Sequence, residues 1–310
     1  MNGGSRTRSA ARARESVRGI SEQVALGTPT PNGEVGGQRG KQRATLAGPA
    51  LQRIEIPAVV KALAGDDRAR CVWQNEVGGL TFELSHHGRR RFLKWAPVGS
   101  GVDIGAEVAR LAWAGRFTPV PRYLESGRDD TGAWLLTDPL PGKSAVSARW
   151  KRQPRLAVIA IGEGLRGLHD ALPVDECRFS WSAADRVSDA RQRAALDRID
   201  PRAWHFEHRE MSVDQALDKL TDIPSLDRAV VCHGDACAPN TILRANGRWS
   251  GHVDLGAMGV ADRWADLAVA TWSATWNYGP GWEQELLAAY GVDPDPVRTD
   301  YYRLLWDLDP

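Results

Sequence analysis

The stretch VVCHGDACAPNTIL, residues 230–243, constrains the fold of this chain more than any other segment. It places a short polar loop between two apolar runs whose β-branched composition is typical of strands. The loop carries Asp235 and Asn240 in the spacing D-x-x-x-x-N, and Asp254 follows at the end of the next apolar run, in VDLG. Because rigid elements commonly hold the loops that carry function, the sequence predicts two strands that present a reacting loop.

The three polar side chains of this region suit phosphoryl transfer. One carboxylate can accept or orient the proton of an acceptor hydroxyl, while the amide and the second carboxylate supply hard oxygen ligands to Mg²⁺. The alternative is an Asx-type turn, in which Asp235 and Asn240 only bond to backbone groups ahead of the strand TIL. The spacing alone leaves that alternative open.

A nucleotide site also needs a positive charge for the phosphates. Lys94 is the only one of the chain's lysines that lies within an alternating apolar run, RFLKWAP. In a strand, its ammonium can reach phosphates as a compact point charge. Glu107 follows in a helical pattern and can hold that ammonium as an ion pair. The alternatives are an edge lysine that reaches solvent and a solvated helix face.

The order of secondary-structure signals divides the chain into two halves. Three short runs, RCVWQNEV, LTFELSHH and RRFLKWAP, predict an antiparallel meander, and PRYLESG and GAWLLTDPL predict a further strand pair. Pro139, Pro141 and Gly142 then mark a linker. Helical patterns follow at residues 154–172, 182–220, 262–276, 281–291 and 295–306. The sequence predicts an α+β fold, with a small antiparallel β-rich lobe at 50–138, a larger mainly helical lobe at 139–310 and a ligand site between them.

Composition limits the remaining possibilities. Residues 1–49 mix Gly, Ser, Arg, Gln and Pro without a period, and we expect a disordered basic extension there. The net charge of +1 gives no global field that would select nucleic acid. No apolar run of about 18 residues is present to span a membrane, and the four scattered cysteines fit a reducing compartment. We therefore expect a cytoplasmic protein, a monomer or weak dimer, without nucleic-acid or membrane partners.

The order of these motifs resembles that of the aminoglycoside phosphotransferases, bacterial antibiotic kinases with a protein-kinase-like, two-lobed fold. The shared order is a Gly-containing hairpin, a strand lysine, a helical glutamate, H-G-D-x-x-x-x-N and D-L-G. The segments VVCHGDACAPN, LHDALPVDECRF, VDLGAMGVADRWADLA and YYRLLWDL are most similar to the branch that phosphorylates the 3′-hydroxyl of kanamycin- and neomycin-type drugs. The similarity runs from about residue 70 to the C-terminus.

The resemblance implies a role for each matching residue. Asp235 would be the catalytic base, and Asn240 and Asp254 would be Mg²⁺ ligands. Lys94 would contact the nucleotide phosphates while paired to Glu107. The segment NEVGGLTFEL matches the family's nucleotide-positioning loop, whose backbone groups approach the phosphates at Gly78, Gly79 and Leu80.

The neighbours of these residues carry supporting expectations. We expect His233 to be a buried hydrogen-bonding residue, because a histidine in such a place is more often structural than catalytic. Asp262 and Asp266 are expected to brace the loop by capping or by pairing with Arg263. The resemblance places a hinge near residues 137–140, whose main-chain groups would contact the adenine or guanine ring.

Acceptor recognition is expected from charge. Aminoglycosides are polycations, so their site needs carboxylates, and residues 281–310 are rich in them. Asp307 and Asp309 are the predicted acceptor-binding residues, the alternative being a solvated acidic tail. Two positions depart from the branch, which usually has an acidic pair where Trp306 precedes Asp307 and often has arginine at Ala257. The related streptomycin 3″-phosphotransferases carry a similar VCHGD segment, so this regiochemistry stays open.

The resemblance implies an enzyme that uses Mg²⁺ and ATP or GTP to phosphorylate the 3′-hydroxyl of kanamycin- and neomycin-type aminoglycosides, which confers resistance. A streptomycin 3″-phosphotransferase is one alternative, and a kinase for another small hydroxyl metabolite is a second. A catalytically silent nucleotide-binding module is a third. The presence of Asp235 beside the other predicted site residues argues against the silent module, because nucleotide binding alone needs no base.

Overall fold

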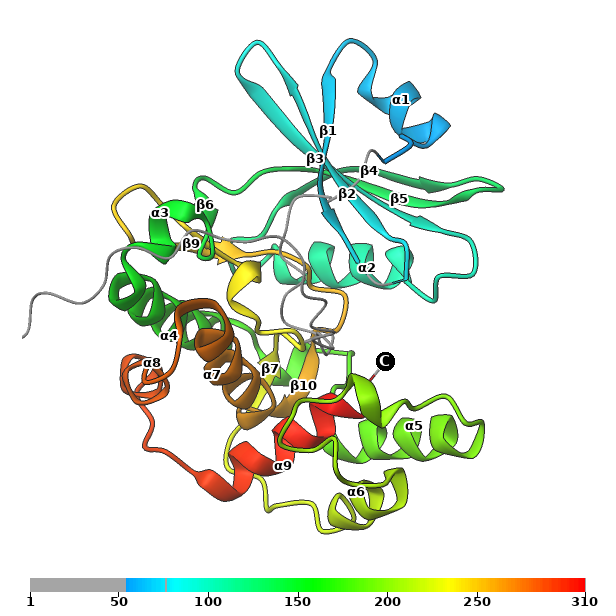
Figure 1. Ribbon diagram of the computed structural model, residues 1–310. Helices are drawn as coiled ribbons and strands as arrows, with labels where there is room; N and C mark the ends of the chain where they lie inside the picture. The colour runs from blue at the N-terminus through cyan, green and yellow to red at the C-terminus, as the bar shows by residue number, and fades with distance from the viewer. Residues whose placement is uncertain (1–53, 76, 310) are drawn as a thin grey trace, which may run out of the picture. The chain divides into compact units, whose positions relative to one another are not determined.

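The computed structural model describes residues 54–75 and 77–309, and these residues fall within one compact unit (Figure 1). The extension predicted for residues 1–49 lies outside the described residues, as do residues 50–53 of the predicted first lobe. Among the described helices, none combines the length and the apolar character that a membrane crossing requires.

A five-stranded antiparallel sheet forms the first half of the described chain (Figure 1). Its strands are β1 (Arg68–Gln74), β2 (Leu80–His86), β3 (Arg89–Pro97), β4 (Arg122–Arg128) and β5 (Gly132–Asp138). Their order, β1-β2-β3-β5-β4, joins the predicted meander and the predicted strand pair into one sheet. Lys94 therefore lies on the central strand, paired with Thr81 on β2 and with Leu135 on β5.

Alternation along β3 decides which way Lys94 points. Leu93 is fully buried and lies in register with Phe82 and Leu136, in a small hydrophobic cluster on one face of the sheet. Helix α1 (Ala58–Ala64) adds Val60 to this cluster. Because successive side chains of a strand point to opposite faces, Lys94 points to the other face.

Helix α2 (Ile104–Ala114) contributes the second charged residue of the predicted pair. Asp103 caps its start by accepting a hydrogen bond from the backbone N–H of Ala106. Its buried residues, Ile104, Glu107, Leu111 and Ala114, recur at helical spacing on one face. This face packs into the larger hydrophobic cluster of the protein and carries Glu107 inward with it.

The second half of the described chain is mainly helical, with two small sheets (Figure 1). One sheet pairs β7 (Ala229–Cys232) with β10 (Gly259–Asp262), and the other has the order β6-β8-β9. The last three strands are Lys143–Ser144, Thr241–Leu243 and Trp249–His252. The helices are α3 (Ala148–Lys151), α4 (Pro154–Ala171), α5 (Ala183–Ala195), α6 (Val213–Lys219), α7 (Trp264–Tyr278), α8 (Glu283–Tyr290) and α9 (Pro296–Asp307).

Two segments differ from the sequence-based expectation. Residues 182–220 were predicted to be mostly helical, but residues 196–212 form turns with one short 3₁₀ segment at Pro201–Ala203. Asp197 has φ of 53°, which a helix does not tolerate, and Pro201 lacks the N–H that a continuing helix needs. Strand β10 was missed because its four residues run directly into the helical pattern of α7.

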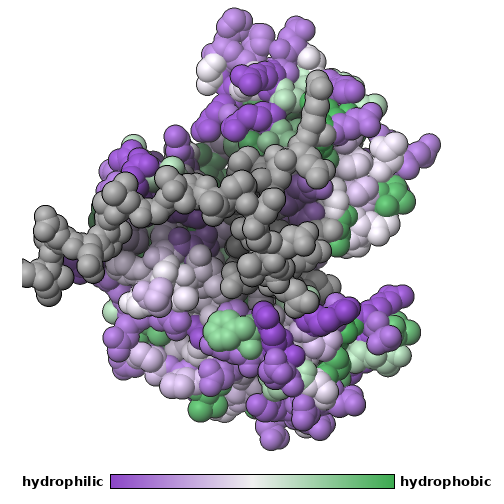
Figure 2. All heavy atoms as spheres, viewed as in Figure 1, coloured by the Kyte–Doolittle hydropathy of each residue, from purple (hydrophilic) through white to green (hydrophobic). Residues whose placement is uncertain are grey.

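Charge gathers at one end of the five-stranded sheet. Figure 2 shows hydrophilic side chains over the outer ends of β1, β2 and β3. His86, His87, Arg89 and Arg90, around the β2–β3 turn, are all exposed. The arginine-rich start of β3 is therefore solvated, while the Lys94 end of the same strand faces the rest of the protein.

Candidate active site

Lys94 connects the sheet to the helical half of the chain. Its Nζ lies 2.6 Å from Oε2 of Glu107 and 2.6 Å from Oδ1 of Asp254. The structure thus forms the predicted ion pair and adds a second carboxylate to it. Burial alone would lower the pKa of Lys94, but the charges of Asp254 and Glu107 outweigh it and raise the pKa above its usual value. The ammonium is therefore held in its charged form.

The two carboxylates respond to Lys94 in different ways. The ammonium lowers the pKa of Asp254, which keeps this side chain ionised. Burial raises the pKa of Glu107, although Lys94 opposes the shift. The side chain of Asp254 is 41% exposed, whereas that of Glu107 is 8% exposed. Glu107 is therefore enclosed as a structural partner, whereas the side chain of Asp254 is partly accessible.

Asp235 and Asn240 lie in one loop between β7 and β8. The amide nitrogen of Asn240 donates to the backbone oxygen of Asp235 and to Oδ2 of its carboxylate, both at 3.0 Å. The turn-like bonding considered as an alternative is thus present, and it leaves the amide oxygen of Asn240 available as a ligand. Oδ1 of Asp235 is buried and has no hydrogen-bond partner among the described residues. Burial, and then the charge of Asp254, raise the pKa of Asp235.

His233 connects the loop that carries Asp235 to the loop that carries Asp254. Its Nδ1 accepts a hydrogen bond from the backbone N–H of Asp235 at 3.2 Å, and its Nε2 lies 2.9 Å from the carbonyl oxygen of Val253. A carbonyl can only accept, so Nε2 donates the hydrogen in this contact. The buried hydrogen-bonding role expected for His233 agrees with these contacts, which join the Asp235 loop to the residue before Asp254.

Asp266, on α7, holds the start of the loop. Its carboxylate accepts hydrogen bonds from the backbone N–H groups of His233 and Gly234, at 2.6 and 3.0 Å, and lies 3.0 Å from Nε2 of His169. Ser273, also on α7, accepts from the backbone N–H of Ala238. Helix α7 therefore anchors the loop at both ends, and these buried contacts preorganise the residues between them.

Of the two contacts expected for Asp262 and Asp266, the structure shows the capping of backbone N–H groups, while Arg263 has another partner. Asp266 braces the loop without Arg263, and Asp262 accepts from the backbone N–H groups of Trp264 and Asp227. Arg263 instead pairs with Asp227, with Nε 2.6 Å from Oδ2. The arginine directly precedes α7 and pairs with a residue 36 positions earlier, so sequence proximity was a poor guide to its partner.

His169 was missed by sequence reasoning. It lies on α4, and its Nδ1 is 2.8 Å from the hydroxyl of Tyr290 on α8. The side-chain atoms of His169, Cys232 and Asp266 that could bind a metal lie within 4.8 Å of one another, which is close enough to hold a metal ion. Each of these atoms already has a hydrogen-bond partner in the protein, with Cys232 donating to the carbonyl of Asp262. The cluster therefore acts as a brace under the loop.

At Gly234, the loop that carries Asp235 lies in direct contact with the loop that follows Asp254. Its φ is +84°, and a Cβ added there would lie 2.3 Å from the carbonyl oxygen of Ala257. Asp254, in the neighbouring loop, also has a positive φ, of 65°. Such backbone strain at a non-glycine residue persists only where the surroundings enforce it, and it clusters at functional sites.

We predict that Gly234→Ala destabilises the protein by about 2 kcal/mol or more, because the added methyl meets rigid backbone at a positive φ. Thermal unfolding followed by circular dichroism measures the effect. Gly88→Ala is the matched control, since Gly88 has φ of +81° and an added Cβ there meets nothing within 4 Å. An equal loss of stability in both variants would show that the contact with Ala257 contributes nothing.

The predicted nucleotide-positioning loop joins β1 to β2. Asn75 shapes it, since the N–H of Gly79 donates to Oδ1 of Asn75 at 2.5 Å and the N–H of Asn75 donates to the carbonyl of Gly79 at 2.9 Å. Gly78 has φ of +85° and Leu80 packs into the small hydrophobic cluster. The phosphate contacts of Gly78, Gly79 and Leu80 stay a prediction.

Asp307 and Asp309 were expected to be available to a cationic acceptor, but both already have partners within the protein. Asp307 is 5% exposed, accepts from the backbone N–H of His205 and lies 2.6 Å from Nδ1 of His208. Asp309 pairs with Arg186 on α5. Both carboxylates are thus engaged inside the protein, because buried charges need partners. Their binding of an acceptor stays a prediction that requires these contacts to be exchanged.

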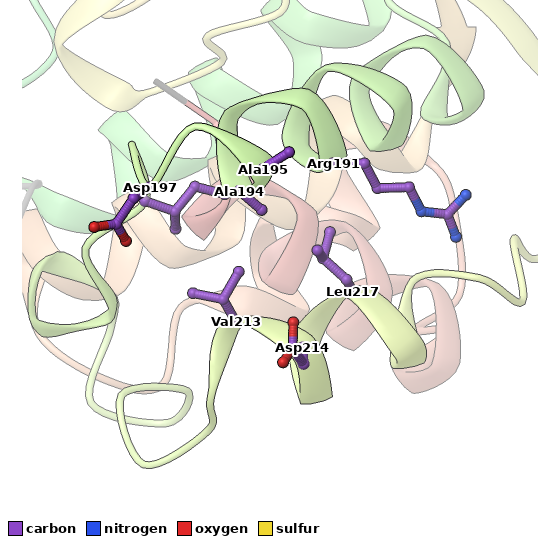
Figure 3. A pocket seen from close by; sticks show the side chains of 8 residues that line it. Arg191, Ala194, Ala195, Asp197, Val213, Asp214 and Leu217 are labelled. Atoms are coloured by element: carbon purple, nitrogen blue, oxygen red, sulfur yellow. The ribbon is translucent and has the colours of Figure 1, made fainter.

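A hollow of about 430 Å³ lies elsewhere, between α5 and α6 (Figure 3). Figure 3 shows Arg191 and Asp197 on one side of it, and Val213, Asp214 and Leu217 on the other. None of its lining residues is a predicted site residue. The hollow therefore contributes nothing to the constellation around Lys94.

The chain is similar to known proteins along most of its length. A profile described as a phosphotransferase enzyme family matches residues 75–302. The chain is 38% identical over 220 residues to an aminoglycoside 3′-phosphotransferase of Streptomyces fradiae, which covers 68% of this chain and 81% of the relative.

Solved structures show the same likeness. An aminoglycoside 3′-phosphotransferase of type VIII has a TM-score of 0.71 at 31% identity, covering 81% of this chain and 97% of that chain. The aminoglycoside phosphotransferase APH(3″)-Id of Streptomyces rimosus, in complex with ADP and streptomycin, has a TM-score of 0.65 at 30% identity, covering 80% and 95%. These likenesses confirm the fold class predicted from the sequence.

Proposed function

The chain belongs to the phosphotransferase enzyme family, among its aminoglycoside phosphotransferases, and we propose that it transfers the γ-phosphoryl group of ATP to the 3′-hydroxyl of kanamycin- and neomycin-type antibiotics. The observation that carries the proposal is the meeting of Lys94 with Glu107 and Asp254, beside the loop of Asp235 and Asn240. This set supplies a phosphate contact, metal ligands and a base, the parts that phosphoryl transfer requires.

Asp235 is the proposed base. One oxygen of its carboxylate is held by Asn240, and the other is buried without a hydrogen-bond partner among the described residues. That free oxygen can accept the proton of an acceptor hydroxyl. Because burial and the neighbouring charge of Asp254 raise its pKa, Asp235 is a stronger base than an ordinary aspartate.

Lys94 is the proposed phosphate ligand. Its ammonium has three N–H donors, and Glu107 and Asp254 account for two of them. The third is available for a phosphate oxygen. Glu107 and Asp254 also fix the direction of that donor, so a phosphate meets an ammonium that is already oriented.

Mg²⁺ fits the donor set of this site. The amide oxygen of Asn240 and the carboxylate of the partly exposed Asp254 are hard ligands of the kind that Mg²⁺ prefers. When bound, the ion would neutralise charge on the phosphates. The bound ADP of the Streptomyces rimosus relative supports an adenine nucleotide over GTP.

The proposal includes resistance to the drug, action in the cytoplasm and a monomer or weak dimer. The four cysteines are free thiols, which suits a reducing compartment. A streptomycin 3″-phosphotransferase is the second candidate, because a relative of that type has nearly the same identity and coverage as the 3′-enzyme. The higher TM-score of the 3′-enzyme favours the first candidate.

The test is ADP release by the purified protein with kanamycin, neomycin, streptomycin and a lividomycin-type drug that lacks the 3′-hydroxyl. We expect turnover with kanamycin and neomycin and none with the 3′-deoxy drug. Turnover with streptomycin alone would select the second candidate. No turnover with any of the four would overturn both and point to another hydroxyl acceptor.

A further inference from the structure

The face of α2 that carries Glu107 also carries Arg110, one helical turn further on. Nε of Arg110 donates a hydrogen bond of 2.8 Å to the carbonyl oxygen of Met258, in the loop that follows Asp254. Its Nη1 donates back to the carbonyl of Ala106 on its own helix, at 3.3 Å. Arg110 therefore links α2 to the loop of a proposed metal ligand.

A side chain from a third segment supports the guanidinium. The carbon at the centre of the Arg110 guanidinium lies 4.8 Å from the centre of the Phe179 ring. The carbonyl of Phe179 accepts from the N–H of Val260 at 2.8 Å, and the N–H of Trp181 donates to the carbonyl of Val260 at 3.0 Å. Both partners of Arg110, the Met258 carbonyl and the Phe179 ring, are thus attached to β10.

Strand β10 leads directly to the other reacting loop. Gly259, which follows Met258, pairs with Cys232, and Cys232 precedes His233 at the start of the loop of Asp235. The contact of Arg110 therefore reaches the backbone that holds both Asp254 and Asp235. On the other side of Arg110, α2 holds the Glu107 that fixes Lys94.

The position of α2 decides whether Lys94 is oriented. Helix α2 meets the Asp254 loop at two points on one face, through the ion pairs of Lys94 and through Arg110. Apolar packing also holds α2, but the ion pairs add little to its orientation, because an ammonium is a compact charge rather than a planar group. The planar guanidinium of Arg110 donates to the Met258 carbonyl and stacks on the Phe179 ring at the same time, so it fixes a second point on the helix.

We propose that Arg110 is a positioning residue of the phosphotransfer site, which holds α2 against the Asp254 loop so that Lys94, Glu107 and Asp254 keep one arrangement. This inference rests on the proposed function, since it assigns Asp254 to the metal and Lys94 to the phosphates. Arg110 itself touches neither the nucleotide nor the acceptor. Its loss acts through the geometry of the residues that do.

The test compares Arg110→Met, Arg110→Lys and Arg116→Met. Methionine keeps the apolar stem of Arg110 but loses the donors, and lysine keeps the charge but loses the planar fork. Arg116 is the matched control, because it lies just beyond the same helix, stacks on Phe117 at 4.8 Å and pairs with Glu176 at 3.5 Å, away from the site. The measurements are kcat, the KM of the acceptor, the Mg²⁺ concentration for half-maximal rate and the affinity for MgADP.

We expect Arg110→Met to lower kcat about tenfold and to raise the half-saturating Mg²⁺ concentration several-fold, with the KM of the acceptor unchanged, since small misplacements of reacting groups are costly. Arg110→Lys should show most of this loss, and Arg116→Met should stay within about twofold of the parent. A purely structural role would lower Tm and leave the Mg²⁺ dependence as it was.

Unchanged kcat and unchanged Mg²⁺ dependence in Arg110→Met would overturn the inference. The MgADP titration separates this failure from failure of the proposed function, because it requires no acceptor. If the parent protein phosphorylates no drug but binds MgADP, weaker MgADP binding by Arg110→Met still supports the positioning role. Equal MgADP binding by both proteins overturns it.

Discussion

We expect Asp235→Asn to lower the kcat of phosphoryl transfer about 10³-fold, which lies within the range for a lost general base. Asparagine keeps the size of the side chain and can still bond to Asn240, but it cannot accept the proton of the acceptor hydroxyl. The oxygen that loses this function is Oδ1, the buried atom without a partner among the described residues. We expect MgADP to bind with unchanged affinity, since Lys94 and Asp254 are intact. Single-turnover assays and MgADP titration measure the two quantities.

Asp222→Asn serves as the control, because Asp222 is an exposed aspartate on the segment before β7. Residual turnover of Asp235→Asn within tenfold of the parent would remove Asp235 from the role of base.

The pH profile gives a second check on the parent protein. A base acts in its ionised form, and burial raises the pKa of Asp235. We therefore expect kcat/KM to fall toward acid pH, beginning at a higher pH than an ordinary aspartate would give.

We expect Asp254→Asn to lower kcat about 10²-fold to 10³-fold, since a bound metal is worth several kcal/mol of charge stabilisation in phosphoryl transfer. Two causes add here. The change removes a carboxylate ligand, and it removes one of the two partners that orient Lys94. We also expect the half-saturating Mg²⁺ concentration to rise at least tenfold. Rates measured over a range of Mg²⁺ concentrations give both quantities.

Asp67→Asn is the matched control for Asp254→Asn. Asp67 also forms an ion pair, with Nη2 of Arg91 at 2.8 Å, but on the α1 side of the sheet. Loss of an ion pair away from the site should leave the Mg²⁺ dependence unchanged. The charge of Asp254 also raises the pKa of Asp235, so the acid limb of the residual activity should move to lower pH in Asp254→Asn. A parental Mg²⁺ dependence in Asp254→Asn would contradict its role as a ligand.

The site residues that sequence reasoning identified share one property. Lys94 and Glu107 lie in neighbouring elements with clear periodic patterns, and Asp235 and Asn240 lie in one loop, so their types and spacing carried the signal. The contact of Lys94 with Asp254 joins residues 160 positions apart, and although the chemistry of phosphoryl transfer assigned both to one site, no pattern predicted their direct contact. Arg110 and His169 had no signal, because a hydrogen bond to a distant backbone carbonyl or a buried carboxylate leaves no local pattern.

The acidic side chains near the C-terminus show that a local run of charge does not predict whether its members are exposed. A run of carboxylates is usually solvated, yet Asp307 is buried against His208, which lies 99 positions earlier in the chain. In the fold, the strands and long helices were predictable from periodicity. Strand β10 was not predictable, because it is short and runs directly into a helix. The turns at residues 196–212 were not predictable either, because local backbone geometry interrupts the expected helix there.

Two carboxylates pair with the Lys94 ammonium, and Asp235 lies close enough to Asp254 to feel its charge, so under the proposed function we expect charge to influence the order in which ligands bind. Glu107, Asp254 and Asp235 together carry more negative charge than Lys94 can balance when all are ionised. A triphosphate approaching without a cation is repelled by this surplus, whereas a chelated triphosphate brings the charge that the surplus attracts. If the site binds the magnesium complex of ATP as proposed, recognition of the nucleotide is joined to recognition of its counterion, and we expect uncomplexed ATP to compete only weakly.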